Sequence, residues 1–346
     1  MTELARFASH DRVLVAAPHP DDEAIATGGV LQAARSAGAA CRVLVVTDGD
    51  NNPWPQRWIE KRWHIGAADR ARWGAQRRGE ALAALQVLGI DAADARCLGF
   101  PDLGLTDQLM TGAPEFAAQL ARQVAEFQPT CLFLPALDDR HPDHSALHVA
   151  LQLAISGMRS ARPKLYAFGV HGETPMQEDV VLTLGPAEQA TKRAAIMMHR
   201  TQMRLSRRRF LAYAGAHERY RTVAGNGELA AHPLHARVDA NTLRIRIDHA
   251  RFGRSLAGQS LFVVAQSSSG DVLRGRVDLA SAADEKMIDT ASGRRLGRVQ
   301  IDRSADATIV SFPLQSELGG AWIKLARPVP GLFVLDRFGW QGVATA

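Results

Sequence analysis

The sequence predicts an α/β fold: a Rossmann-like, mostly parallel β-sheet with helices on both faces, followed by a C-terminal all-β domain that is sandwich-like. The first observation is a set of short, continuous apolar runs, which includes residues 12–17 (RVLVAA), 41–47 (CRVLVVT) and 130–134 (TCLFL). Such runs, alternating with helical stretches, are typical of parallel strands covered on both faces. The second observation is that helical periodicity stops near residue 235, where short alternating runs separated by Gly, Asp and Ser begin.

The elements of the α/β part follow in chain order. We expect a strand at 12–17, a helix at 23–37 that ends before Gly38, and a strand at 41–47. Further helices are predicted at 75–88, 114–127, 144–158 and 186–199, and further strands at 95–98, 130–134, 164–170 and 180–184. Ligands of such sheets bind beyond the carboxyl ends of the strands.

The C-terminal part is predicted to be a small β-sandwich. Its strands are expected at 242–247, 260–265, 272–277, 299–301, 308–312, 321–325 and 332–335. The composition changes near the Gly-Asn-Gly sequence at 225–227, and we place the domain boundary after residue 230. Residues 1–230 then form the α/β domain, and residues 231–346 form an accessory domain.

Length and composition describe an ordinary globular protein: 346 residues, 46% hydrophobic and 22% charged. The N-terminus lacks the apolar core of a signal peptide, and no apolar run is long enough for a membrane span. The three cysteines lie in apolar runs, which indicates buried thiols in a reducing, cytoplasmic compartment. The net charge of +5 favours anionic partners, but no nucleic-acid-binding motif is present. The Arg-rich, Lys-poor composition suggests a bacterial source.

Two polar clusters each follow an apolar strand, PHPDDE at residues 18–23 and HPDH at residues 141–144. Pro is favoured at the first helical position, so the histidine that opens each cluster is expected just before a helix. Residues three apart share one face of a helix. His19 can therefore converge with Asp22, and His141 with His144. We expect the two clusters to be halves of one metal site.

Two imidazoles and one carboxylate with open positions form the ligand set of catalytic zinc, and also of non-haem Fe(II). Asp21 directly precedes Asp22, one of the expected ligands, and is expected to point away from it on the turn. A carboxylate beside a metal-bound water is well placed to act as general base. His141, if it is not a ligand, can stabilise an oxyanion. Asp143 can then orient His141.

These clusters resemble the motifs of the PIG-L/LmbE-type N-deacetylases, metal-dependent hydrolases that act mostly on N-acetylglucosaminyl groups. Weaker similarities lie at residues 77–80 (RRGE), at 99–102 (GFPD), and from Lys192 through 199–202 (HRTQ). The resemblance covers residues 10–225 approximately. Some members of the family place a Tyr two residues before the first His of HPDH, whereas this chain has Asp139.

The resemblance implies a residue-by-residue assignment. The implied metal ligands are His19, Asp22 and His144, with one Zn²⁺ per chain. Asp21 would be the catalytic base, and His141 would stabilise the oxyanion. Arg77 and Asp102 would contact the sugar.

Two segments have less specific patterns. Residues 48–73 contain four of the six tryptophans and are basic, and they follow a strand end. They form either a lid that stacks on sugars or an amphipathic flap that packs on the protein body. Residues 200–221 are rich in arginine and form either a solvated face or a patch for phosphate or uronic acid groups.

The leading functional hypothesis is a zinc-dependent hydrolase that removes an N-acetyl group from an amino sugar of the N-acetylglucosamine type and releases acetate. The substrate can be anionic or part of a larger glycoconjugate, and Fe²⁺ is the alternative ion. Two other classes stay open: a glycan-binding protein with a non-catalytic metal site, and an Fe(II) oxygenase with the same three ligands.

Overall fold

The computed structural model describes residues 1–158, 161–172, 178–239, 241–253, 256, 258–280, 286–326 and 335–344. The chain divides into two compact units. Unit 1 consists of Met1–Leu105, Arg122–Ala136 and Met158–Thr222, and unit 2 consists of Thr106–Ala121, Leu137–Gly157 and Val223–Ala346. Within the described residues, no helix has both the length and the apolar character that a membrane crossing requires. The domain boundary after residue 230 stays a prediction.

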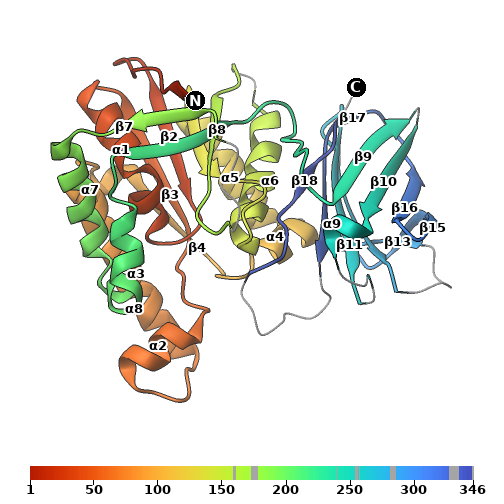
Figure 1. The fold of residues 1–346 in the computed structure, drawn as a ribbon, viewed down its shortest axis with the longest axis horizontal. Helices are drawn as coiled ribbons and strands as arrows, with labels where there is room; N and C mark the ends of the chain where they lie inside the picture. The colour runs from red at the N-terminus through yellow and green to blue at the C-terminus, as the bar shows by residue number, and fades with distance from the viewer. Residues whose placement is uncertain are drawn as a thin grey trace. The chain divides into compact units, whose positions relative to one another are not determined.

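Unit 1 contains an eight-stranded sheet that is parallel except at one strand (Figure 1). Its strand order is β1 (Thr2–Glu3), β7 (Val180–Thr183), β8 (His217–Thr222), β6 (Lys164–Phe168), β5 (Cys131–Pro135), β2 (Arg12–Ala17), β3 (Ala40–Thr47) and β4 (Ala95–Phe100). β8 runs antiparallel to both of its neighbours. The predicted fold, a mostly parallel sheet flanked by helices, is confirmed.

The helices are α1 (Asp22–Ser36), α2 (Pro53–Glu60), α3 (Ala67–Val87), α4 (Leu105–Thr111), α5 (Pro114–Phe127), α6 (Pro142–Ser156), α7 (Pro186–Met198), α8 (Arg200–Ala212) and the short α9 (His249–Phe252). In unit 1, α1 packs against β2 and β3, and α1, α3 and α7 pack on one another. α1 ends where Gly38 adopts a left-handed φ of 75°, a conformation that glycine tolerates best.

Several elements differ from the sequence-based expectation, for example helices α4 and α8, which were not expected. α3 begins at Ala67 and not at residue 75, because the Asp69 carboxylate accepts the Gly66 N–H at 3.1 Å and closes the first turn. α2 lies within residues 48–73, for which no helix was predicted, and Pro53 follows its N-cap Asn52. Strand β8 was not expected, since its buried positions carry Glu218 and Tyr220 in place of an apolar alternation.

Unit 2 contains two antiparallel sheets. One has the order β15 (Gln300–Arg303), β16 (Ala307–Pro313), β10 (Thr242–Asp248) and β9 (Leu234–Asp239). The other has the order β14 (Arg295–Arg298), β13 (Lys286–Asp289), β12 (Val272–Asp278), β11 (Ser260–Ser267), β17 (Leu318–Ala326) and β18 (Gln341–Gly342). Both sheets contribute to one buried core, for example through Ile245 and Val263. The all-β prediction is confirmed; residues 332–334 of the last predicted strand lie outside the described residues.

A buried ion pair joins α7 to β8 in unit 1. Lys192 Nζ lies 2.6 Å from Glu218 Oε1, and both side chains are at most 2% exposed. The same carboxylate accepts the backbone N–H groups of Gly29 at 2.6 Å and Val30 at 3.0 Å. A Cβ at Gly29 would lie 2.5 Å from the Leu184 side chain, so glycine permits this close approach. Glu218 therefore ties β8 to both α1 and α7.

We expect Lys192→Met to lower the free energy of unfolding by about 3–5 kcal/mol, because it leaves the Glu218 charge buried without its cation. Chemical denaturation of the purified protein measures this loss. The matched control is Arg219→Met, which removes a half-exposed cation from Glu178 at 3.5 Å and should cost less than about 1 kcal/mol. Equal losses in the two variants would contradict a special role for the buried pair.

Candidate functional site

The first cluster lies on the turn between β2 and α1. Thr47, the last residue of β3, fixes the start of this turn, because its N–H and its hydroxyl both donate to the Pro18 carbonyl at 2.9 Å. Asp21 has φ 142° and ψ −30°, a region that non-glycine residues avoid at a cost of about 1–3 kcal/mol. Its N–H donates to Glu23 Oε2 at 2.9 Å, which helps to hold this conformation.

The Asp21 carboxylate is buried against Arg77. Arg77 Nη2 lies 3.1 Å from Asp21 Oδ2 and donates to the Pro20 carbonyl at 2.8 Å, while Nη1 donates to the Gly49 carbonyl at 2.6 Å. Burial raises the pKa of Asp21 to about 6, although the Arg77 charge opposes this rise. The carboxylate is therefore ionised at neutral pH, yet it can accept a proton more readily than an exposed aspartate.

A second buried ion pair lies behind this turn. His199, which links α7 to α8, has Nε2 2.8 Å from Glu23 Oε1, and both side chains are at most 1% exposed. Burial by itself would lower the pKa of His199, but the charge and hydrogen bond of Glu23, together with Asp21, raise it above its ordinary value. The raised pKa favours the cationic form of His199, and its charge opposes the rise in the pKa of Asp21.

Each ring nitrogen of His19 faces a carboxylate. His19 Nδ1 lies 3.3 Å from Asp22 Oδ2, and His19 Nε2 lies 3.2 Å from Asp102 Oδ1. Asp102 follows β4 and accepts the backbone N–H of Asn51 at 2.8 Å. Burial would raise the pKa of Asp102, but the hydrogen bond and charge of His19, with Arg77 and Asn51, lower it overall. An ionised Asp102 can thus fix the tautomer and orientation of the His19 ring.

The second cluster follows β5 and opens α6. β5 pairs with β2 in parallel, with Val13 opposite Cys131, so the chain leaves both strands at the same edge of the sheet. His144 is fully buried, and its Nδ1 lies 3.1 Å from Asp139 Oδ2. His141 is the N-cap of α6, and its Nδ1 accepts the backbone N–H of Asp143 at 3.3 Å.

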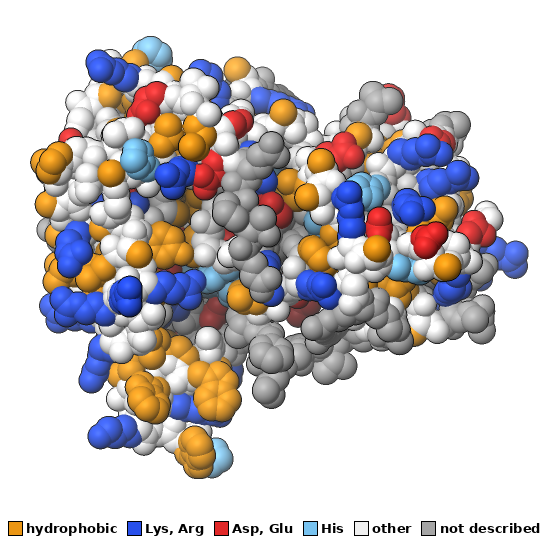
Figure 2. All heavy atoms as spheres, in the orientation of Figure 1, with side chains coloured by type: hydrophobic (Ala, Val, Ile, Leu, Met, Phe, Trp, Pro, Cys, Tyr) orange, Lys and Arg blue, Asp and Glu red, His pale blue; other side chains and the backbone are white. Residues whose placement is uncertain are grey.

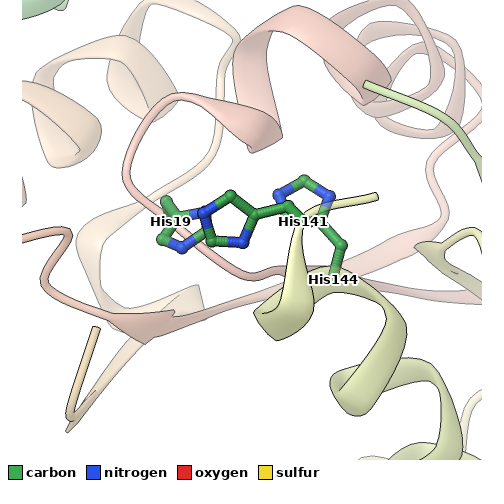
Figure 3. A group of neighbouring side chains, drawn as sticks. All are labelled: His19, His141 and His144. Atoms are coloured by element: carbon green, nitrogen blue, oxygen red, sulfur yellow. The ribbon is translucent and has the colours of Figure 1, made fainter. Parts of the chain in front are cut away.

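Two groups of side chains are close enough to share a metal ion. In one, donor atoms of His19, His141 and His144 all lie within 4.8 Å of one another, and Figure 3 shows the three imidazoles gathered together. In the other, the same limit holds for donor atoms of His19, Asp102 and Asp143. All five residues are buried. Asp22 lies beside His19 but in neither group.

The distances within the clusters fit a divalent ion with nitrogen and oxygen ligands. Two ligands about 2.1 Å from one ion at a tetrahedral angle lie about 3.4 Å apart, close to the 3.3 Å between His19 Nδ1 and Asp22 Oδ2. His19 Nε2 faces the carboxylate of Asp102, and His144 Nδ1 faces that of Asp139. Metal-binding histidines commonly donate their other ring N–H in this way.

The contact at His141 differs from those at the other two histidines. Because its Nδ1 accepts a backbone N–H, the proton of the neutral ring belongs on Nε2. A protonated nitrogen cannot bind a metal but can donate to a developing oxyanion. The Asp143 backbone N–H makes this contact; that the Asp143 side chain orients His141 stays a prediction.

Several residues of this site received no role from the sequence. Glu23 and His199 support the turn, and Asp139 contacts His144. Glu80 accepts the N–H and hydroxyl of Thr201 and so connects α3 to α8. The motif similarities had included Glu80, His199 and Thr201, so the signal was present, but only the fold shows what they contact.

Residues 14–155 match the family model described as "PIG-L: GlcNAc-PI de-N-acetylase". This segment includes both polar clusters, Arg77 and Asp102.

Several curated relatives carry the name 1D-myo-inositol 2-acetamido-2-deoxy-alpha-D-glucopyranoside deacetylase. The protein of Mycobacterium sp. (strain KMS) is 31% identical over 170 residues, which cover 45% of this chain and 53% of the relative. The protein of Mycolicibacterium vanbaalenii is 32% identical over 171 residues, which cover 45% and 58%. The chain therefore spans about half the length of the curated relatives it matches.

Among solved structures, the chain is similar to the N,N'-diacetylchitobiose deacetylase of Pyrococcus horikoshii. The identity is 18% and the TM-score is 0.46, and the match covers 61% of this chain and 83% of that chain.

We expect Asp139→Asn to weaken the affinity for zinc by about 10–100-fold, because the amide no longer supplies the charge that raises the basicity of the His144 ring. Competition with a fluorescent chelator measures this affinity. The isosteric control is Asp107→Asn in α4, an exposed position that should leave zinc affinity unchanged. If the Asp139 variant bound zinc as tightly as the wild type, Asp139 would have no influence on the metal site.

Proposed function

We propose that this chain, whose residues 14–155 are a PIG-L family domain, is a zinc-dependent hydrolase that removes the N-acetyl group from an amino sugar. The observation that carries the proposal is that His19 and His144, two of the proposed ligands, share one buried group with His141, and that Asp21, two residues after His19 on the same turn, is a buried carboxylate whose pKa is raised to about 6. A metal ion beside a general base is one arrangement that catalyses amide hydrolysis, because the ion activates water and the base accepts its proton.

The proposed ligands are His19 Nδ1, Asp22 Oδ2 and His144 Nε2. Asp102 and Asp139 hold the opposite nitrogens of the two rings. A divalent ion at this position would act as a Lewis acid, which lowers the pKa of water and polarises the acetyl carbonyl.

Asp21 removes a proton from the attacking water, which adds to the acetyl carbon. His141 donates from Nε2 to the carbonyl oxygen while negative charge develops there. Asp21, now protonated, returns its proton to the leaving amine, and acetate and the free amino sugar are released. Arg77 keeps Asp21 ionised between turnovers, because its guanidinium lies 3.1 Å from the carboxylate.

The substrate class is supported by the curated relatives, whose name describes an acetamido sugar linked to inositol. We propose that Arg77 and Asp102 contribute to sugar binding, in addition to the contacts described above. The direct test is acetate release from inositol-linked N-acetylglucosamine, N,N'-diacetylchitobiose and free N-acetylglucosamine. Chelated protein reloaded with Zn²⁺ or Fe²⁺ identifies the ion. Absence of acetate release from all three with either ion would refute the proposal for this substrate class.

We expect Asp21→Asn to retain zinc but to lose about 10²–10⁴-fold in kcat, because the amide cannot accept a proton. Acetate release and elemental analysis of the same sample measure the two properties. Asp91→Asn is the control: this exposed aspartate makes no side-chain capping bond, and activity should not change. A near-normal rate in the Asp21 variant would remove this residue from the mechanism.

We expect His141→Ala and Asp22→Ala to have opposite signatures. Loss of the Nε2 donor should reduce kcat by about 10²–10³-fold and leave the zinc content intact. Loss of the Asp22 carboxylate should reduce the zinc content itself. The reverse outcome, with zinc lost from the His141 variant and kept in the Asp22 variant, would make the three histidines the ligand set.

A further inference from the structure

One lobe of unit 1 exposes aromatic side chains to an unusual extent. This lobe, the tryptophan lobe, consists of residues 53–73, which contain α2 and the start of α3, and residues 200–212 of α8. Trp54, Trp58 and Trp63 are 59%, 79% and 80% exposed. Figure 2 shows hydrophobic side chains on the surface over α2, with Lys and Arg side chains beside them. Indoles are costly to leave in water, so a cluster of three marks a binding surface.

The tryptophan lobe is also the most cationic part of the chain. It contains ten Lys and Arg residues against two acidic residues, a net charge of +8, whereas the whole chain carries +5. The rest of the chain is therefore net negative. The two acidic residues are already neutralised, because Asp69 pairs with Arg62 and Arg72, and Glu60 pairs with Arg72.

Several other cations of the lobe are exposed, namely Lys61, Arg204, Arg207 and Arg208, while Arg57 is half-buried. Within the described part of the chain, no carboxylate lies within ion-pair distance of Arg57, Lys61, Arg204, Arg207 or Arg208. Arg57 lies over the Trp54 ring, 5.0 Å from its centroid. The positive charge of this surface is thus available to an anionic partner.

A concavity joins these two features. A cavity of about 610 Å³ is lined by the three exposed indoles, by Ile59 and by four cations, of which Arg204 comes from α8. Its walls are therefore apolar and its charged groups are all positive. An amphiphile with an apolar body and an anionic head complements such a cavity in both respects.

We propose that the tryptophan lobe docks on the surface of an anionic lipid bilayer. Indoles reside at the level of the lipid head groups, and Lys and Arg bind the lipid phosphates. Leu205, 38% exposed on α8, adds an aliphatic side chain to the same lobe. A single-stranded nucleic acid would stack on the indoles and bind the cations, but it offers no aliphatic partner for Ile59 and Leu205. The bilayer accounts for all of these groups, and this docking does not depend on the proposed hydrolysis.

The test is flotation of the full chain with vesicles of phosphatidylcholine alone and of phosphatidylcholine mixed equally with phosphatidylglycerol. We expect binding to the anionic vesicles only, a blue shift of the tryptophan emission on binding, and loss of binding at high salt. No binding to the anionic vesicles, or equal binding to both kinds, would overturn the proposal. Preferential binding of a single-stranded oligonucleotide at the same salt concentration, abolished by the variants below, would also overturn it.

Variants identify the surface. Trp58→Ser combined with Trp63→Ser should weaken vesicle binding about tenfold or more, and the control Met197→Ser removes an exposed apolar side chain on α7 without effect. Arg204→Glu with Arg208→Glu should abolish binding to anionic vesicles. Its charge-matched control is Arg295→Glu with Arg298→Glu on strand β14, two exposed positions. All four substituted lobe residues are exposed, so the melting temperatures of these variants should match that of the wild type. Equal weakening in lobe and control variants would refute this docking surface.

Discussion

The ion pair between Asp21 and Arg77 is the interaction on which the rest of the site depends. Asp21 occupies a backbone conformation that side chains normally avoid, and its carboxylate is buried, so both its position and its charge need support. Arg77 supplies both, because the guanidinium that pairs with the carboxylate also binds the carbonyls of Pro20 and Gly49. Gly49 must remain a glycine here: a Cβ would lie 1.8 Å from Arg77 Nη1.

A similar arrangement, in which one buried ionisable side chain is held by another, recurs around the turn. Glu23 joins His199 to the backbone of Asp21, while Asp102 and Asp139 stand behind the histidine rings of the two clusters. Each pair fixes a ring or a carboxylate that would otherwise rotate, and each removes the cost of an isolated buried charge. A site built in this way is preorganised before any ion or substrate arrives.

The tryptophan lobe is connected to this network within unit 1. Arg70 of the lobe donates to the Asn51 side chain at 2.8 Å, and Asn51 in turn donates its backbone N–H to Asp102, the carboxylate that holds His19. Contacts through Arg70, Asn51 and Asp102 therefore link the surface proposed to dock on a bilayer to His19, a proposed metal ligand. This path provides a physical route by which the position of the lobe can influence the orientation of the His19 ring.

The sequence by itself determined the fold class and the composition of the two clusters. Continuous apolar strands require a covered sheet, and a His-Pro pair after such a strand indicates a helix start, so His19 and His141 were found without coordinates. Sequence could not reveal strand β8, because its inward positions carry Glu218 and Tyr220, whose burial depends on Lys192 and on the Gly29 backbone. Nor could it pair Glu23 with His199 or Asp139 with His144. Local sequence sets the periodicity and the turns, whereas the partner of a buried charge is chosen by tertiary packing, which brings together residues that are distant along the chain.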